Sequence, residues 1–260
     1  MTPGPVPQSY VEYQPPAALR EYVECFWTRG AVPATEARHH VIPDGCIDLL
    51  FTYDSLAASD GPASAFAVGT MTRPLSVGAT EAAAYVGVRF WPGRALPFLG
   101  VPAAEITDLR VAIADIWRSR DQSLVDTHLT ALGGWRGPFE RLLLARLGRA
   151  AGAEPGDRTV DAAVRAILRA GGNLSIASLA PALGVTRQHL ARAFARHVGV
   201  PPKMFARVAR VRRVLAKARV ASRLDWAALA LDAGYYDQAH LAGEVREITG
   251  RTPTEWLPSA

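Results

Sequence analysis

The spacing of apolar residues divides the chain into a first part that favours strands and a second part that favours helices. Between Val23 and Trp91, short runs rich in β-branched and aromatic residues alternate with Gly- and Pro-containing turns, which is typical of a small sheet or barrel. The predicted strands cover residues 25–28, 40–42, 47–53, 66–71 and 84–91. From Pro102 onward, apolar residues recur every three or four positions, which predicts helices over 124–132 and 139–147 that pack on the sheet.

These patterns predict an α+β fold with two domains. Residues 1–16 hold five prolines, so we expect an extended or disordered arm there. Residues 17–153 are expected to form a small β-rich domain with packed helices. The Ala- and Gly-rich stretch 148–156 has little to bury and predicts a linker, with a boundary near residue 154. Residues 154–260 are then expected to form an all-α domain.

The helical half contains an internal repeat. Leu179-Ala180 followed by Gly184 recurs as Leu229-Ala230 followed by Gly234, at an offset of 50 residues. After one inserted residue the offset becomes 51, and it then relates the pairs Leu190 and Leu241, Phe194 and Val245, Gly199 and Gly250, Pro202 and Pro253, and Phe205 and Trp256. An ordered set of matches predicts a duplicated structural unit.

Each copy has the signals of a helix, a tight turn and a second helix, over about 175–196 and 226–247. Gly184 or Gly234 ends the first helix, and Thr186 or Asp237 caps the second. A predicted helix over 204–219 separates the two copies and acts as a spacer. This is helix-turn-helix geometry, in which the second helix of each copy fits a major groove about 12 Å wide.

The outward side chains of these second helices carry chemistry suited to DNA. Arg can form two hydrogen bonds to guanine and Gln can form two to adenine. The second copy is poorer in donors, so we expect it to contribute less to specificity. An ordinary helical bundle with solvated arginines is the alternative, and it would leave the duplication unexplained. The candidate DNA-binding residues are Thr186, Arg187, Gln188 and Arg192 in the first copy, Gln238, Ala239, His240 and Gly243 in the second, and Arg213 in the spacer as a phosphate contact.

Charge is unevenly distributed along the chain. Of the 29 Lys and Arg and the 24 Asp and Glu, 16 basic and 8 acidic residues lie in 157–260, which leaves 13 basic and 16 acidic residues for 1–156. The basic half favours an anionic partner, and nucleic acid is preferred over a membrane because no basic amphipathic anchor accompanies it. No apolar stretch is long enough to span a bilayer, no leader pattern opens the chain, and two cysteines provide no disulfide framework. We therefore expect a cytoplasmic protein.

With these motifs in place, the last hundred residues resemble the DNA-binding domain of AraC/XylS-type transcription regulators. The resemblance implies double-stranded DNA as partner, base contacts from Gln188 and Arg192 in the first copy, and base contacts from Gln238, Ala239 and Gly243 in the second. It also implies regulation of transcription, for which activation and repression both remain open, and RNA polymerase is a candidate further partner. The family usually has Arg in place of Gly243 and Phe in place of Val245. The strings that carry the resemblance are Leu179-Ala180-x-x-x-Gly184-Val185-Thr186-x-x-x-Leu190-x-Arg192-x-Phe194, Leu229-Ala230-x-x-x-Gly234-Tyr235-Tyr236-Asp237-Gln238-Ala239-His240-Leu241 and Gly250-Arg251-Thr252-Pro253.

The amino-terminal half resembles the less characterised sensor domains attached to some of these regulators. The strings that carry this resemblance are Ile42-Pro43-Asp44-Gly45-Cys46-Ile47-Asp48-Leu49-Leu50-Phe51 and Gly87-Val88-Arg89-Phe90-Trp91-Pro92-Gly93-Arg94-Ala95. The resemblance implies a β-rich, cupin-like unit that binds a small-molecule effector or mediates homodimer formation.

The candidate effector pocket combines charged and aromatic residues of two predicted strands. Asp48 and Arg89 would meet a ligand, and Phe51, Tyr85 and Phe90 would line the pocket around them. The alternative is a plain core in which Asp48 and Arg89 form one internal ion pair.

A cluster of metal-ligating residue types provides a second functional hypothesis. His39, His40, Asp44, Cys46 and Asp48 lie within ten residues, and Cys46 and Asp48 would share one strand face. A metal site here would make the protein a metal-dependent cupin-type enzyme with an accessory helical domain. The favoured interpretation is that Asp44-Gly45 forms a turn, that Cys46 is a small buried hydrophobe, and that no metal is bound.

The sequence lacks a nucleophile elbow, a phosphate loop and a dinucleotide-binding fingerprint, so we expect neither an enzyme nor a cofactor. The leading prediction is a sequence-specific, one-component transcription regulator with a sensing or self-associating amino-terminal domain. A third hypothesis is an architectural DNA-binding protein without sequence preference, whose first half is inert.

Overall fold

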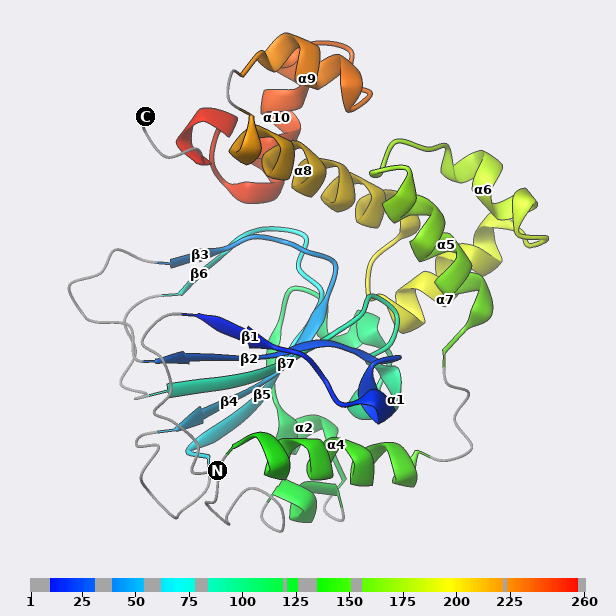
Figure 1. Ribbon diagram of the computed structural model, residues 1–260. Helices are drawn as coiled ribbons and strands as arrows, with labels where there is room; N and C mark the ends of the chain where they lie inside the picture. Colours follow the sequence, from blue (N-terminus) through cyan, green and yellow to red (C-terminus); the bar gives the residue numbers. More distant parts are fainter. Residues whose placement is uncertain are drawn as a thin grey trace.

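The computed structural model describes residues 10–30, 39–53, 62–77, 84–118, 121–125, 135–150, 156–221 and 224–256. It shows a β-rich amino-terminal part and an all-helical carboxy-terminal part (Figure 1), so the α+β, two-domain prediction is confirmed. The predicted boundary near residue 154 lies outside the described residues.

An antiparallel six-stranded sheet forms the body of the amino-terminal domain, with strand order β1-β2-β7-β4-β5-β8. The short strands β3 and β6 form a separate pair. The strands predicted from the sequence are all present, and three strands of three residues each were not predicted. The bounds are β1 (Val11–Tyr13), β2 (Val23–Gly30), β3 (His39–Val41), β4 (Ile47–Tyr53), β5 (Ser64–Val68), β6 (Leu75–Val77), β7 (Ala84–Phe90) and β8 (Arg110–Ala112).

Strand β1 lies within residues 1–16, which were expected to form an extended or disordered arm; residues 1–9 of that segment lie outside the described part of the chain. Val11, Glu12 and Tyr13 pair with Thr28, Trp27 and Phe26 of β2. The prolines of this region lie before and after β1, so the three residues between them can donate to the ladder. The amino-terminal sheet therefore includes residue 11.

One face of the six-stranded sheet is covered by helices (Figure 1). The Phe51 ring of β4 meets Phe139 at a centroid distance of 4.6 Å, and the Phe90 ring of β7 meets Phe98 at 4.7 Å. Aromatic contacts of this kind dominate the burial energy of a small core. The predicted helix over 139–147 is confirmed, whereas most of the one predicted over 124–132 lies outside the described residues. Among the described residues, 121–125 are also helical. The helices and 3-10 turns with full bounds are η1 (Ala17–Leu19), α1 (Leu96–Leu99), η2 (Ala103–Ile106), α2 (Ile113–Ile116) and α4 (Arg136–Arg149).

The carboxy-terminal helices form two small cores joined by one long helix. Leu190 and Phe194 lie in the first core, and Leu241 and Val245 occupy the corresponding places in the second. The long helix α8 (Pro202–Val220) contributes Phe205 to the first core and other residues to the second. The duplication and the spacer are therefore both present. The remaining elements are α5 (Arg158–Arg169), α6 (Ile176–Ala182), α7 (Arg187–His197), α9 (Trp226–Asp232), α10 (Gln238–Thr249) and η3 (Pro253–Trp256).

The two domains are packed against each other through the first core and α8. The hydroxyl of Thr70 donates to the carbonyl of Val198 at 2.5 Å, and Arg94 pairs with Asp161 at 2.7 Å. At Gly45, φ is +82°, and a Cβ there would lie 2.5 Å from the Phe205 ring of α8. The turn after β3 therefore requires glycine both for its backbone conformation and for the close approach of α8.

Candidate DNA-binding surface

Helix α7 presents its predicted DNA-binding residues to solvent. The Thr186 hydroxyl accepts from the backbone N–H of His189 at 3.1 Å and so caps the amino terminus of the helix, as predicted. Leu190 and Phe194, four residues apart, are fully buried and fix which side of the helix faces inward. The opposite side therefore faces outward, and Thr186, Arg187, Gln188 and Arg192 are all exposed.

Helix α10 repeats this arrangement with fewer polar groups. The Asp237 carboxylate accepts from the backbone N–H of His240 at 2.7 Å, and Leu241 and Val245 are buried. Nothing lies within 4 Å of the place where a Cβ of Gly243 would stand, so this position borders open space. His240 is exposed, but its ring packs edge-on against Tyr235. The other predicted contacts of the second copy, Gln238, Ala239 and Gly243, are also exposed.

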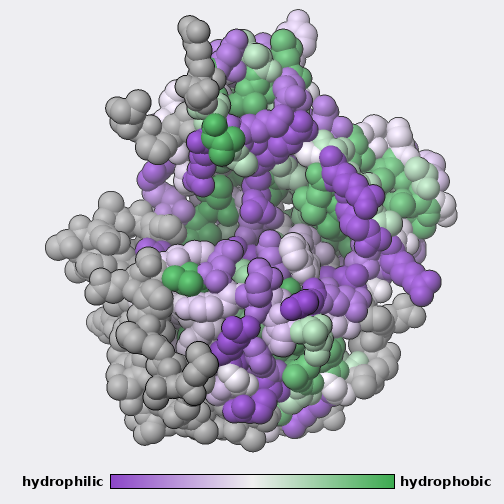
Figure 2. Space-filling view, viewed as in Figure 1, coloured by the Kyte–Doolittle hydropathy of each residue, from purple (hydrophilic) through white to green (hydrophobic). Residues whose placement is uncertain are grey.

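Helices α7 and α10, the predicted recognition helices, differ in charge. Helix α7 carries Arg187, Arg192 and Arg196 and no acidic residue. Helix α10 with its cap Asp237 carries one arginine against three carboxylates. Hydrophilic side chains form bands over the carboxy-terminal helices on the side shown in Figure 2. The electrostatic attraction for a DNA backbone is therefore concentrated on α7.

Several arginines of α8 are engaged inside the domain. Arg207 Nε donates to Glu244 Oε1 at 2.9 Å, and Arg210 Nε donates to Glu244 Oε2 at 3.1 Å. The Tyr235 hydroxyl also donates to Glu244, at 2.6 Å. Burial acts to raise the pKa of Glu244, but the hydrogen bonds from Tyr235 and Arg207 and the charge of Arg210 outweigh it, so the pKa is lowered. These contacts fasten α10 to α8, and the sequence pattern gave no sign of Glu244.

Arg213 is placed differently from the expected phosphate contact. Its guanidinium donates to the carbonyl of Ala170 at 3.5 Å and to the carboxylate of Asp232 at 3.4 Å, and the side chain is half-buried. Lys217 Nζ also donates to Asp232, at 2.6 Å, and this hydrogen bond lowers the pKa of Asp232. Arg213 therefore holds α9 and the end of α5 against α8.

The five residues that were predicted to line an effector pocket do not line one cavity. Phe51 and Phe90 point toward the helices and are completely buried in the main core. Asp48 and Arg89 face each other across β4 and β7 on the opposite side of the sheet, because successive residues of a strand alternate between its faces. Tyr85 lies an even number of residues from Arg89 and shares that side. The prediction that these residues line one cavity is therefore wrong.

Asp48 and Arg89 instead belong to an ion-pair network. Arg89 Nε lies 3.5 Å from Asp48 Oδ1 and 3.4 Å from Asp44 Oδ2, and Trp27 Nε1 donates to Asp48 Oδ1 at 2.7 Å. Burial raises the pKa of Asp48 to about 6, although Arg89 acts in the opposite direction. This arrangement matches the alternative of an internal ion pair.

The candidate metal ligands do not converge in the described part of the chain. Asp44 Oδ1 accepts from the backbone N–H of Cys46 at 2.9 Å, which makes a local turn, and Cys46 is buried. His40 Nδ1 lies 3.2 Å from the Ser76 hydroxyl. The side chain of His39 lies outside the described residues. Among the residues that are described, no three His, Cys, Asp or Glu side chains are arranged to hold a metal ion.

Comparisons with known proteins match the two halves separately. Residues 179–259 match a helix-turn-helix domain family, and residues 11–112 match a domain family of unknown function, DUF6597. No curated protein matches the chain significantly. None of the described helices combines the length and apolar character needed to cross a membrane.

The solved structures that match this chain have low sequence identity and low TM-scores. An AraC-type transcriptional regulator from Chromobacterium violaceum is 24% identical, covers 41% of this chain and 92% of its own, and has a TM-score of 0.36. ToxT from Vibrio cholerae is 8% identical over 89% of this chain and 97% of its own, with a TM-score of 0.45. An unsaturated fatty acid-bound form of ToxT is 11% identical over 97% of this chain and 96% of its own, with a TM-score of 0.41. Scores this low transfer no property of those proteins to this chain.

Proposed function

We propose that the protein is a sequence-specific regulator of transcription of the AraC type that binds double-stranded DNA, since residues 179–259 match a helix-turn-helix domain family. The observation that carries the proposal is the outward side of α7. It exposes Arg187, Gln188 and Arg192 from a helix whose inward side is fixed by two buried residues. The first two lie in the opening turn of α7, the part of a recognition helix that contacts base edges.

We propose that the spacer helix holds α7 and α10 so that both can bind one side of a DNA duplex. Both α7 and α10 contact α8, whose 19 residues span about 28 Å at 1.5 Å per residue. Successive major-groove segments on one side of B-DNA lie about 34 Å apart. In the proposed mechanism α7 provides most of the affinity and base discrimination, because α10 carries more carboxylates than cations. Gln238, Ala239, His240 and Gly243 make a smaller contribution.

The amino-terminal domain is proposed to adjust DNA binding in response to a small molecule or to self-association. It contacts the end of α7 through Thr70 and the spacer helix through Gly45. A change in these contacts would act on the elements that position the recognition helices. A homodimer, contact with RNA polymerase as an activator, and a cytoplasmic location belong to this proposal.

Selection from randomised duplexes tests the function. We expect the full chain to enrich a defined sequence, and we expect Arg192→Ala to relax one or two positions of it while leaving the others intact. Arg141→Ala removes an exposed arginine of α4 on the other domain and is the matched control, with no expected change. Failure of the wild-type chain to enrich any sequence would contradict specific recognition and would favour an architectural DNA-binding protein.

A further inference from the structure

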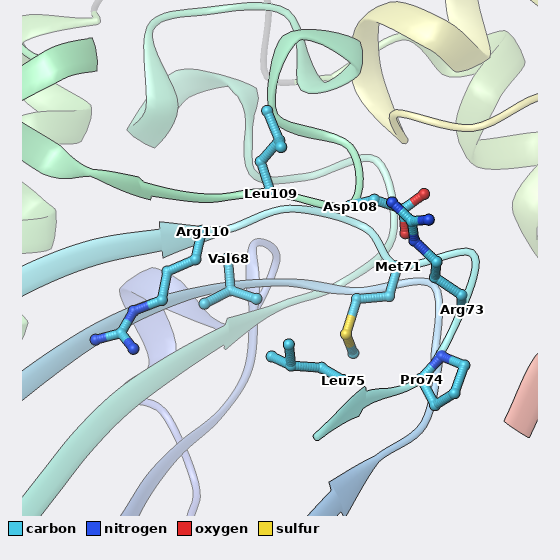
Figure 3. A pocket seen from close by; sticks show the side chains of 8 residues that line it. All are labelled: Val68, Met71, Arg73, Pro74, Leu75, Asp108, Leu109 and Arg110. Atoms are coloured by element: carbon cyan, nitrogen blue, oxygen red, sulfur yellow. The ribbon is translucent and has the colours of Figure 1, made fainter. Parts of the chain in front are cut away.

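A small hollow opens on the amino-terminal domain between the ends of β5, β6 and β8 (Figure 3). Its volume is about 80 Å³. Val68, which lines the hollow, is the cross-strand partner of Asp48, but none of the residues predicted as effector ligands lines it. A water-sized group needs about 10–15 Å³ measured in this way, so the hollow has room for about six such groups.

The lining combines an apolar floor with cations at its edges. Val68, Met71 and Leu75 point toward one another in Figure 3, and the Leu75 side chain is 41% exposed. Arg73 and Arg110 lie on opposite sides of this floor, and both are exposed. The Arg110 guanidinium stacks over the Phe66 ring at 3.6 Å, which restricts its position. Uncovered apolar surface beside two cations is suited to a small anion that has an apolar body.

The only carboxylate of the lining is already engaged. Asp108 Oδ1 accepts from the backbone N–H of Thr72 at 2.7 Å, and Asp108 Oδ2 accepts from the Thr72 hydroxyl at 2.6 Å. Its backbone φ is +57°, and it is the one non-glycine among the described residues with a positive φ. A strained residue that closes two loops together is a feature of ligand clamps and switch regions. Arg73 and Arg110 outnumber Asp108, so the lining has a net positive charge. The hydrogen bonds of Asp108 hold the two loops of the wall together.

The two loops that form the walls also hold the end of the first recognition helix. The Thr70 hydroxyl donates to the carbonyl of Val198, and the Thr107 hydroxyl donates to the carbonyl of Gly199 at 2.6 Å. These two carbonyls directly follow α7. The loops are joined to each other because the backbone N–H of Asp108 donates to the carbonyl of Thr70 at 3.1 Å.

The wall of the hollow reaches the second recognition helix as well. Pro74 lines the hollow, and its Cγ lies 3.0 Å from where a Cβ of Gly250 would stand. Gly250 is the left-handed residue that ends α10. One small cavity is thus bordered by loops that touch the carboxy-terminal ends of both recognition helices.

We propose that this hollow binds a small organic monoanion with a short apolar body, and that its occupancy changes DNA affinity through residues 69–74 and 107–109. The DNA readout rests on the proposed function, whereas binding of the anion does not. The anionic group would contact Arg73 or Arg110, and the apolar body would cover Val68, Met71 and Leu75. A monocarboxylate of about four to six carbons matches the volume.

The test uses the full chain and two probe pairs: 3-methylbutanoate with 3-methylbutanamide, and hexanoate with hexanamide. Calorimetry should show saturable binding of the carboxylates and at least about tenfold weaker binding of the neutral amides, because only the carboxylates can pair with arginine. Arg73→Ala and Arg110→Ala should each weaken carboxylate binding, and Arg141→Ala on α4 should not. The site would be overturned if neither carboxylate showed saturable binding, or if the amides bound as tightly as the carboxylates. It would also be overturned if neither arginine variant changed carboxylate binding.

The coupling is tested separately with Thr70→Val and Thr107→Val, which remove the hydroxyls that hold the end of α7. Carboxylate binding should persist in both variants. The change in DNA affinity on adding carboxylate, expected to be about fivefold or more in the wild type, should be reduced. A wild-type affinity for DNA that does not respond to a bound carboxylate would overturn the coupling. Loss of specific DNA binding by the ligand-free chain would instead overturn the proposed function and leave the anion site standing on its calorimetry.

Discussion

Glu244 provides the sharpest test of how the second helix-turn-helix is held to the spacer. Its carboxylate accepts hydrogen bonds from Arg207 and Arg210 of α8 and from Tyr235, and it is buried. Glu244→Ala removes the acceptor and leaves two guanidinium groups and a phenol without it. We expect the packing of α10 on α8 to be weakened while the first core, which shares none of these contacts, is unaffected.

The size of the effect follows from burial. Removing one partner of a buried ion pair typically costs about 3–5 kcal/mol because a desolvated charge is left behind. The side chains of Arg207 and Arg210 are 23% and 18% exposed, so water can reach them after the substitution and the lower end applies. A loss of about 3 kcal/mol corresponds to about a 150-fold increase in the population of locally open states.

Hydrogen exchange measured by mass spectrometry on the full chain reports this quantity. Amides of 226–256 should exchange about two orders of magnitude faster in Glu244→Ala, with those of α7 unchanged. Glu247→Ala is the matched control, since Glu247 also pairs with Arg207 but is 64% exposed, so its loss should change stability by less than about 1 kcal/mol. Equal exchange in the two variants would refute the assignment of Glu244 as the anchor.

The difference in hydrogen exchange between wild type and Glu244→Ala should depend on pH in a defined direction. The pKa of Glu244 in the folded chain lies below its ordinary value of 4.5. Its stabilising contribution is therefore complete above about pH 4.5 and is lost as the pH falls through the lower, folded-state pKa. The difference in exchange between wild type and Glu244→Ala should be constant near neutrality and shrink in acid. A difference that grows as the pH falls would contradict this sign.

Three further predictions concern the DNA-binding surface and the contact between the domains. Arg192→Ala should weaken binding to a selected duplex by about 1–3 kcal/mol in fluorescence anisotropy, and an unchanged affinity would remove this side chain from the base-reading set. Arg213→Ala should leave the slope of log affinity against log salt unchanged because Asp232 already engages its guanidinium, whereas a slope lower by about one would show a phosphate contact. Gly45→Val should separate the domains, because a Cβ would lie 2.5 Å from the Phe205 ring and φ at this residue is +82°. Small-angle scattering should then show a larger radius of gyration. An unchanged scattering profile would show that the contact between the domains adapts to the side chain.

The helical half was predictable because its signals are local and repeated. Gly184 and Gly234 both adopt positive φ, and Thr186 and Asp237 both cap the helices that they were expected to cap. Leu190, together with Phe194, defines an inward side that can be read from a spacing of four residues. These features need no knowledge of distant parts of the chain.

The charged partners of the spacer helix could not be predicted in this way. Arg207 and Arg210 meet Glu244, which lies more than thirty residues further along the chain, and only the packing of α10 brings it to them. Arg213 looked like a phosphate contact for the same reason, since Asp232 is remote in the sequence. A basic helix can therefore be neutralised internally by carboxylates of the elements it supports.

The effector pocket illustrates a different kind of error. Arg89 and Phe90 are consecutive residues of one strand, so strand geometry alone places their side chains on opposite faces. The hollow beside Asp108 depends instead on loops that are brought together by hydrogen bonds across 36 residues of sequence. Its connection to α7 spans 128 residues, from Thr70 to Val198. Neither feature leaves a periodic pattern in the sequence.

In the proposed function, α7 reads base sequence from a rigid domain that contains two helix-turn-helix units. The most direct measurement is the equilibrium affinity of the full chain for a selected duplex and for the same duplex with its base order scrambled, at one salt concentration. We expect the selected duplex to bind about a thousandfold or more tightly than the scrambled one. Equal affinities would show that the arginines of α7 bind only the DNA backbone and would contradict the claim.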